Sequence, residues 1–507
     1  MGKYINPFSK TAENLAMQFD EATVNKDADK LKHLIEEALE KIDTYDDASQ
    51  AQIFYCIGTV LSVIDSISGV VRNEDSYEKQ IYYFRRSIEI IEKSEFNRDE
   101  YVPYIVGFKC NLYTNYANAL NQTGRMVAAI EQYNLVLSVN PSFGMAFGSL
   151  GKAYQFYGRL VSDPGHQLHL HHYAYACLSK AVNSDDPNMY DAAKAGFKGY
   201  MEQYAPEYIE KILSAPLDIR QFEYSDKNEL VYREWVLKNG LFLNPLNDLP
   251  YIEFAYATDS LQLPPITTSI DVDKPIFHEM FNQLKQEYIF ARFQYYSALK
   301  EPDIPHFADK DTHILNLLDY QQYSIRVEQI KSSFRTLYSL FDKVAFFINE
   351  YFGLGIRKKD VSFSSIWLSE KRGKDAYKYA NSLNVGNNYA IDSLHWIRKD
   401  FYRKFHKSPY PQAKRVSDIR HALEHRYTKV YWDLVIDATT DIEDELAITV
   451  SEEELKKETL RLLKLVREVI ICLSLSVGIE EHKKNKDEEG KLSMSVPLFE
   501  LKDEWKL

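Results

Sequence analysis

A helical hairpin pattern between Leu112 and Pro141 is the feature that most constrains the fold of this chain. Small or apolar residues recur there at three- and four-residue intervals, as they do along one face of an α-helix. They form two runs on either side of Gly124, first Tyr113, Tyr116, Ala117 and Leu120, then Ala129, Tyr133 and Val136. The pattern predicts a helix, a short turn at Gly124 and a second helix that ends before Pro141.

Similar units flank this hairpin and predict a stacked array. The next unit has Phe147, Leu150, Gly151 and Tyr154 followed by Ala174, Leu178 and Ala181, with an insertion that holds the letters SDPGHQLHLHHY. An earlier, looser unit has Phe54, Ile57, Gly58 and Leu61 followed by Phe84 and Ser87, and residues 11–42 add another hairpin. One hairpin cannot bury its apolar face alone, so neighbours stack into a curved solenoid with a concave binding face. The pattern resembles the tetratricopeptide (TPR) repeat, whose period is about 34 residues.

The composition fits a helical protein with a large core. The 507 residues are 45% hydrophobic and 14% aromatic, and only 19 Gly and 17 Pro argue against a β-sandwich or a disordered chain. The four cysteines form no CxxC pair, which fits a reducing compartment and predicts no zinc site. Residues 1–20 lack a long apolar run, and the most apolar windows, such as 466–479, are too short to span a bilayer. We therefore expect a cytoplasmic protein with no membrane partner.

The organisation of the chain changes after about Tyr204. Residues 241–265 are rich in Pro, Asn and Asp and show no helical period, so we interpret them as an irregular connector. Long helices are predicted at 275–299, 324–352 and 451–479 from apolar residues at helical spacing. The predicted fold class is all-α, with TPR-like repeats (1–204), a connector (205–265) and a helical domain with a C-terminal tail (266–507).

The letters RHALEHRY, residues 420–427, place two histidines and an arginine in one short run. We predict a helix from Asp418 to about Leu434, with Ser417 as its N-cap. At about 100° per residue, one side of that helix carries an apolar stripe made of Ile419, Leu423, Tyr427, Val430 and Leu434. His421 and His425 are four residues apart, so they are neighbours, and they lie nearly opposite the stripe. This position does not suit a core histidine, and the alternative to a functional site is a solvated polar face.

Positive charge is concentrated around this run. Between His395 and Val430 there are ten basic and three acidic residues, a local charge of +7 in a chain of net charge −13. The aromatic residues interleaved with them are Trp396, Phe401, Tyr402, Phe405 and Tyr410. Cations contact the phosphates of single-stranded nucleic acid, and aromatic rings stack on its bases. The region therefore predicts one concentrated RNA-binding site rather than a diffuse nucleic-acid-binding surface.

Arg420 and His425, with four residues between them, match the Arg-x4–6-His signature of HEPN domains. The segments EWVLKNGLFLNPLNDL and TLYSLFDKVAFFINEYFGLGI also resemble motifs of a HEPN subfamily that follows TPR repeats, so the resemblance runs from about Leu230 to the end of the chain. It implies an all-helical domain, metal-independent RNA cleavage, and a homodimer in which two motif helices face a shared cleft. Many HEPN nucleases have Asn directly after the Arg, where this chain has His421. His421 is therefore either a polar contact or a second catalytic group.

The chemistry of these side chains suits RNA cleavage without a cofactor. An imidazole can take the proton of the 2′-OH while that oxygen attacks the adjacent phosphorus, and a guanidinium can bind the charged phosphate oxygens. Arg420, in the first turn of the predicted helix, adds the positive helix end. We predict Arg420, His425 and His421 as catalytic residues. The predicted substrate-binding residues are Arg403, Lys404, Lys414, Arg415, Arg426 and Lys429.

Two further features carry separate predictions. Tyr427 gives the form Arg-x4-His-x-Tyr, and in some HEPN toxins a Tyr so placed is modified by a nucleotidyltransferase antitoxin; the alternative, which we favour, is that Tyr427 packs in the core. The run GHQLHLHHY, residues 165–173, has a His-rich spacing that can bind metal, but no Cys accompanies it. We expect a structural or surface role for these histidines.

Two functions from different classes fit the sequence. The first is an endoribonuclease, acting as a bacterial toxin or antiphage defence effector and controlled by an unknown protein or ligand on the TPR-like surface. The second is a non-catalytic TPR–HEPN adaptor whose basic patch binds RNA or a protein partner. Arg420 and His425 favour the first function, and His421 in place of Asn favours the second.

Overall fold

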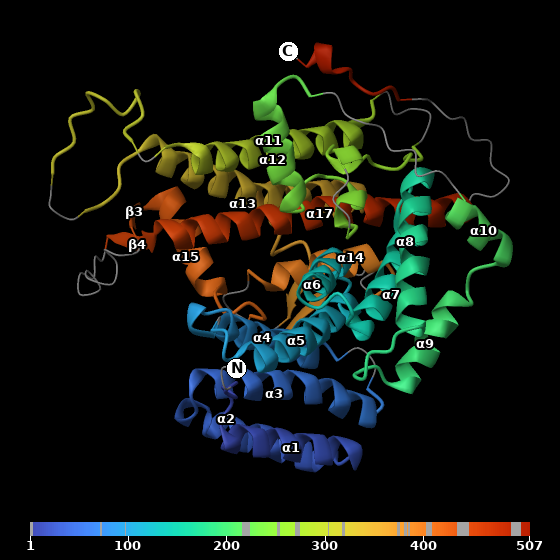
Figure 1. Cartoon of the computed structure of the whole chain (residues 1–507). Helices are drawn as coiled ribbons and strands as arrows, with labels where there is room; N and C mark the ends of the chain where they lie inside the picture. Colours follow the sequence, from blue (N-terminus) through green and yellow to red (C-terminus); the bar gives the residue numbers. More distant parts are fainter. Residues whose placement is uncertain are drawn as a thin grey trace.

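The computed structural model describes residues 4–70, 73–96, 98–214, 224–250, 254–268, 274–302, 304–316, 320–372, 376–379, 383, 386–401, 408–432, 446–487 and 498–506. In these residues the chain is largely helical, with two small two-stranded sheets. Stacked helical hairpins form the N-terminal part, and a bundle of longer helices forms the C-terminal part (Figure 1). The predicted all-α fold class is therefore confirmed.

Helical hairpins build the N-terminal part because each helix is apolar on the face that meets its neighbour. The helices are α1 (Lys10–Val24), α2 (Ala28–Glu40), α3 (Asp47–Ile67), α4 (Glu74–Ile91), α5 (Val102–Gln122), α6 (Met126–Val139), α7 (Gly144–Leu160), α8 (Pro164–Val182), α9 (Asp191–Met201) and α10 (Pro206–Ser214). Consecutive helices from α3 to α9 contact one another, and α1 packs on α3. The hairpin predicted at 112–141 is confirmed as α5 and α6, with its turn at Gly124.

The predicted insertion in the following unit is wrong. Helix α8 begins at Pro164, directly after the short turn that follows α7, so the His-rich run forms the first turns of a regular helix. His171 is buried, with Nδ1 2.9 Å from the hydroxyl of Tyr204, and burial lowers the pKa of His171 to about 4. His172 Nδ1 lies 2.7 Å from the carbonyl oxygen of Ile212. These contacts join α8 to α10 and to the turn before it, which is a structural role of the kind expected.

The turn at Gly124 fixes how the hairpins meet the bundle. Its φ is +87°, and a Cβ there would lie 2.8 Å from the carbonyl oxygen of Tyr389 and 2.9 Å from the backbone nitrogen of Ser393. Tyr389 and Ser393 belong to α14 (Tyr389–Lys399), so Gly124 allows two backbones to approach closely. This turn therefore lies at a contact between the two parts of the chain.

Replacing Gly124 with Ala is expected to destabilise the protein by about 2–6 kcal/mol, since left-handed backbone strain and overpacking each cost about 1–3 kcal/mol. Gly69→Ala is the matched control, because Gly69 also has a positive φ (+64°) but open space where a Cβ would lie. The free energies of unfolding of both variants in urea separate the cost of backbone strain, which both share, from the cost of the steric contact, which only Gly124→Ala has. Equal losses for the two variants would contradict a tight contact at Gly124.

Helix α3 is long and apolar enough to cross a membrane by length and composition, contrary to the expectation that the apolar windows are too short. In the structure it packs between α1, α2 and α4. Its buried residues, among them Ile53, Phe54 and Ile57, belong to the cores of these hairpins. Packing within the helical array therefore accounts for its apolar character.

The predicted connector, residues 205–265, is irregular only in part, because it includes helices α10 and α11. It contains α11 (Lys227–Lys238) and the 3₁₀ turns Pro245–Asp248 and Phe254–Tyr256. The side chains from Leu241 to Leu249 are mostly buried, and Asn244 and Asp248 bind neighbouring elements through hydrogen bonds. This segment fills the space between the hairpins and the bundle.

The C-terminal bundle forms around one long helix, α17 (Glu452–Asp487). Its other elements are α12 (Ile276–Lys300), α13 (Ile325–Tyr351), β1 (Leu368–Arg372), β2 (Ala376–Tyr379), α14, α15 (Ala413–His425), β3 (Tyr427–Tyr431) and β4 (Ala447–Ser451). Helices α12, α13 and α14 pack on α17, so the three predicted long helices are confirmed as α12, α13 and α17. Strands β1 and β2 pair antiparallel, whereas β3 and β4 pair parallel.

One continuous core joins the hairpins to the bundle. Buried side chains of α4 to α8 and those of α12 to α17 belong to the same apolar cluster. Buried ion pairs cross the junction: Asp400 binds Arg85 and Arg125, and Arg125 also binds Glu468 of α17. The hairpins and the bundle therefore support each other's folding.

Candidate active site

Helix α15 carries the RHALEHRY run, but with different bounds from those predicted. It begins at Ala413, where Gln412 is the N-cap and makes no side-chain capping bond, so Ser417 lies inside the helix. Its buried residues recur every three residues: Ala413, Val416, Ile419 and Ala422. The helix ends at His425, because Arg426 has an extended backbone (φ −140°, ψ −167°) and strand β3 follows. The predicted continuation to Leu434 is therefore wrong.

The two histidines lie on the solvent side of α15. Both side chains are exposed, and their ring centroids are 5.2 Å apart, as expected for residues four apart in a helix. Ile419 and Ala422 lie on the buried side of the same turns. The structure thus brings His421 and His425 together on a surface that a ligand or another protein chain can reach.

Arg420 is half-buried between α15 and α13. Its guanidinium carbon lies 5.0 Å from the centroid of the Tyr338 ring. Its Nε is buried and has no hydrogen-bond partner among the residues that the structure describes. Because α15 starts seven residues before Arg420, the predicted place in the first helical turn is wrong, and the positive helix end does not add to this site.

The other predicted binding residues fall into three groups. Lys414 and Arg426 are exposed, and Lys429 on β3 is half-buried. Arg415 donates to both carboxylate oxygens of Glu454 (2.7 and 2.8 Å) and to the carbonyl oxygen of Thr449 (2.6 Å), and the bond with Glu454 raises the pKa of Arg415. Its guanidinium thus holds α15 to β4 and α17. Arg403 and Lys404 lie outside the described residues.

Part of the basic stretch from 395 to 430 is internal, so the exposed basic surface is smaller than predicted. Arg398 and Lys399 are only 4% and 5% exposed. The Lys399 ammonium pairs with Glu74 (2.7 Å) and with Glu78, so it fastens α14 to α4. Asp400 is buried between Arg85 and Arg125. These partners are distant in the sequence, so a count of charges between residues 395 and 430 does not include them.

The interleaved aromatic residues that the structure describes are buried or half-buried. Trp396 is 8% exposed, and Phe401 packs against Tyr338 and Phe341. The ring of Tyr410 lies 3.8 Å from the guanidinium carbon of Arg461. These rings do not offer faces for bases, and Tyr402 and Phe405 lie outside the described residues.

A different set of aromatic side chains is exposed near α15. Tyr427 is 76% exposed, so the expectation that it packs in the core is wrong, and Trp432 after β3 is 54% exposed. In the segment before α13, Tyr320 and Tyr323 are 65% and 48% exposed. The backbone N–H of Gln322 in that segment donates to the carbonyl oxygen of Val430, which joins it to β3. Tyr427 is exposed because residues 427–431 form a strand and not the predicted helix.

Residues 268–480 match the model of a family described as LA2681-like HEPN. This part of the chain is therefore similar to a HEPN domain, and it contains α12 to α15, both sheets and most of α17. The helical hairpins lie outside the match. No curated protein and no solved structure matched the chain.

Proposed function

We propose that this protein is an endoribonuclease that needs no metal ion and that acts through the exposed face of α15. The main support for this proposal is the exposed His421–His425 pair on α15. The same helix carries Arg420, whose buried Nε has no hydrogen-bond partner among the described residues. An unpaired buried donor is costly, and a guanidinium group suits phosphate oxygens. HEPN domains are typically ribonucleases, and α15 lies inside the matched region.

The chemistry uses only groups of this chain and of the RNA. One imidazole takes the proton from the 2′-OH as that oxygen attacks the phosphorus, and the bond from phosphorus to the 5′-oxygen breaks. A protonated imidazole gives its proton to the leaving 5′-oxygen. The Arg420 guanidinium stabilises the charge on the phosphate oxygens. The products are a 2′,3′-cyclic phosphate and a 5′-OH.

Exposed side chains around α15 support single-stranded RNA as the substrate. Lys414 and Arg426 supply cations, while Tyr427, Trp432 and Tyr323 supply ring faces. Such a mixture binds a flexible phosphate backbone and unstacked bases. The test is cleavage of end-labelled RNA by the full chain, with and without EDTA. Cleavage is expected in both conditions and is expected to weaken with salt; activity that EDTA abolishes and Mg²⁺ restores would contradict the proposal.

A homodimer would complete this site. On an ideal helix Arg420 and His425 lie about 140° apart, so they point to different sides of α15. A phosphate near His425 of one copy would therefore more easily meet Arg420 of a second copy related by two-fold symmetry. We expect light scattering to show a mass twice that of one chain; a strict monomer, even with RNA, would contradict this arrangement.

Mixing two inactive variants tests whether the dimer shares its sites. His425→Ala and Arg420→Ala chains, mixed and allowed to exchange, form about one half heterodimers, each with one intact composite site. We expect the mixture to recover about a quarter of wild-type cleavage. A mixture as inactive as the separate variants would show that each chain carries its own complete site.

The alternative is a non-catalytic adaptor that binds RNA or a protein through the same face. His421 at the position where many HEPN nucleases have Asn is the observation that favours it. An adaptor would bind labelled RNA, would lose that binding with Arg426→Ala, and would leave the RNA intact. Cleavage that depends on His425 would exclude this alternative.

Regulation as a toxin or antiphage effector through the TPR-like hairpins is part of the proposal. The shared core and the ion pairs of Asp400 with Arg85 and Arg125 support direct mechanical coupling between the hairpins and α14. The same contacts mean that regulation should be tested in the full chain, because a fragment without the hairpins would expose that core.

A further inference from the structure

A cleft of about 750 Å³ lies between the hairpins and the bundle. Its walls come from α4 to α6, from the buried segment around Leu249, from the start of α15 and from α17. A volume of this size is typical of sites for small organic ligands. It is distinct from the exposed histidine face, which lies at the other end of α15.

Among the residues that the structure describes, every carboxylate that lines the cleft has a cationic partner. The ion pairs are Glu89 with Arg86, Glu131 with Lys464, Asp248 with Arg467, Asp400 with Arg85 and Arg125, Glu454 with Arg415, Glu458 with Arg461, and Glu468 with Arg125. These pairs satisfy the acidic groups, so a cationic ligand would find no free carboxylate among the described lining residues.

The cleft has cationic groups without an ion-pair partner, beside one buried acceptor without a hydrogen-bond partner, Asn134 Oδ1. Lys238 and Lys457 are exposed lining residues and form no ion pair with any residue that the structure describes. Arg461 binds Glu458 through Nε (2.8 Å), but its Nη2 is buried and has no hydrogen-bond partner among the described residues. Two ammonium groups and one guanidinium nitrogen suit a phosphate dianion better than a single carboxylate.

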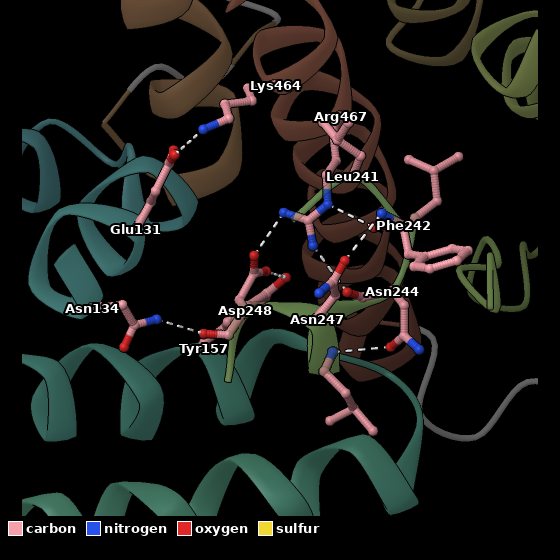
Figure 2. A network of polar contacts seen from close by, with 12 residues as sticks. Glu131, Asn134, Tyr157, Leu241, Phe242, Asn244, Asn247, Asp248, Lys464 and Arg467 are labelled. Atoms are coloured by element: carbon pink, nitrogen blue, oxygen red, sulfur yellow. Dashed lines mark hydrogen bonds and ion pairs between the residues drawn. The ribbon is translucent and has the colours of Figure 1, made fainter. Parts of the chain in front are cut away.

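The remaining lining is largely apolar and well fixed. Ile88, Leu120, Val127, Leu237, Leu249 and Val416 contribute side chains to the walls. Figure 2 shows how one wall is held: Arg467 donates to Asp248 (2.6 Å) and to the carbonyl oxygens of Phe242 (2.6 Å) and Asn244 (3.0 Å), while Lys464 pairs with Glu131. A preformed apolar wall favours a ligand with a flat, weakly polar body.

We propose that this cleft binds a small organophosphate with an aromatic body, of mononucleotide size. Such a ligand would contact the hairpins on one side and Arg415 or Val416 in the first turn of α15 on the other. It would therefore connect the TPR-like part to the helix that carries His421 and His425. The binding site does not depend on ribonuclease activity, because it is defined by the cleft alone.

The test is calorimetric titration and thermal unfolding of the full chain with three probes. Adenosine 5′-monophosphate carries both the charge and the aromatic body, inorganic phosphate carries the charge alone, and adenosine carries the body alone. We expect adenosine monophosphate to bind at least about tenfold more tightly than either of the others and to raise the unfolding temperature. If adenosine binds as tightly as adenosine monophosphate, the ligand need not carry a phosphate, and the proposal is wrong. If inorganic phosphate binds as tightly as adenosine monophosphate, the ligand need not carry an aromatic ring, and the proposal is again wrong.

Point variants locate the binding. Lys457→Gln and Lys238→Gln should each weaken binding of adenosine monophosphate by about tenfold, since each removes one charge-assisted bond. Lys486→Gln is the matched control, because Lys486 is another exposed lysine of α17 and does not line the cleft. Both cleft lysines are exposed, so their replacement leaves folding intact. Absence of binding in wild type, or binding unchanged in both cleft variants, would overturn the proposal.

Discussion

His425→Ala is expected to reduce RNA cleavage by about 100- to 10,000-fold, the range that one general acid–base group contributes. His425 is the last residue of α15, its side chain is exposed, and the only ring that it contacts among the described residues is that of His421. Its removal leaves no cavity, so the urea midpoint should not change. The loss would therefore report on chemistry and not on folding.

A matched variant and a neighbouring variant sharpen this result. His33→Ala removes another exposed helical histidine, far along the chain on α2, and should cleave RNA like wild type. His421→Ala should cause an equal loss if His421 is the second acid–base group and a smaller loss if it only positions the RNA. Full activity in both His421→Ala and His425→Ala would move the active site away from α15.

Asp400→Ala is expected to lower the free energy of unfolding by about 3–5 kcal/mol, the usual cost of removing one partner of a buried ion pair. The carboxylate is 1% exposed and accepts from both terminal nitrogens of Arg85 (2.6 and 3.1 Å) and from Arg125 (3.1 Å). Arg125 keeps Glu468 in the variant, whereas among the described residues Arg85 keeps a hydrogen bond to the hydroxyl of Tyr116 and the rings of Tyr116 and Tyr410, and no carboxylate partner. The loss of stability therefore comes mainly from Arg85, whose guanidinium is left without a carboxylate partner at the junction of the hairpins and the bundle.

Urea unfolding measures this loss, with Asp503→Ala as the control. Asp503 also pairs with a lysine, Lys506, but on the surface, where an ion pair contributes little. We expect no measurable change for Asp503→Ala. A similarly small change for Asp400→Ala would contradict the view that the two parts of the chain are held together by buried charge pairs.

The stability that the Asp400 ion pairs contribute should decrease as the pH falls. Burial alone would raise the pKa of Asp400, but Arg85 and Arg125 outweigh it and lower that pKa below its usual value. A carboxyl group with a lower pKa in the folded state stabilises the protein above its unfolded pKa, about 3.9, and loses that contribution as the pH falls. The stability difference between wild type and Asp400→Ala should therefore be complete at neutral pH and shrink below about pH 4.

The sequence predicted those elements whose signals are local. The helices α5, α6, α12, α13 and α17 follow apolar residues at helical spacing, and Ser324 caps α13 by accepting from the backbone N–H of Val327. The pair of exposed histidines also follows from spacing alone. These features depend on residues within a few turns of each other, so one sequence is enough to reveal them.

The errors arose where the structure depends on distant partners. Strand β3 forms because residues 427–431 pair with residues 447–451, and its apolar Tyr427 and Val430 fit a helical stripe equally well. Lys399 is buried because Glu74 and Glu78 neutralise it from α4. A local count of charge and aromatic residues therefore overestimated the exposed patch and missed the exposed rings of Tyr427 and Trp432.

The central claim is that the α15 face cleaves RNA by attack of the 2′-OH without a metal ion. The most direct measurement uses a short RNA with a mapped cleavage site and the same RNA with a single 2′-deoxy residue just before that site, both in EDTA, with analysis of the product ends. The account predicts a 2′,3′-cyclic phosphate and a 5′-OH from the first RNA and no cleavage at that position in the second. Cleavage of the 2′-deoxy RNA at the same position, or products that carry a 5′-phosphate, would contradict it.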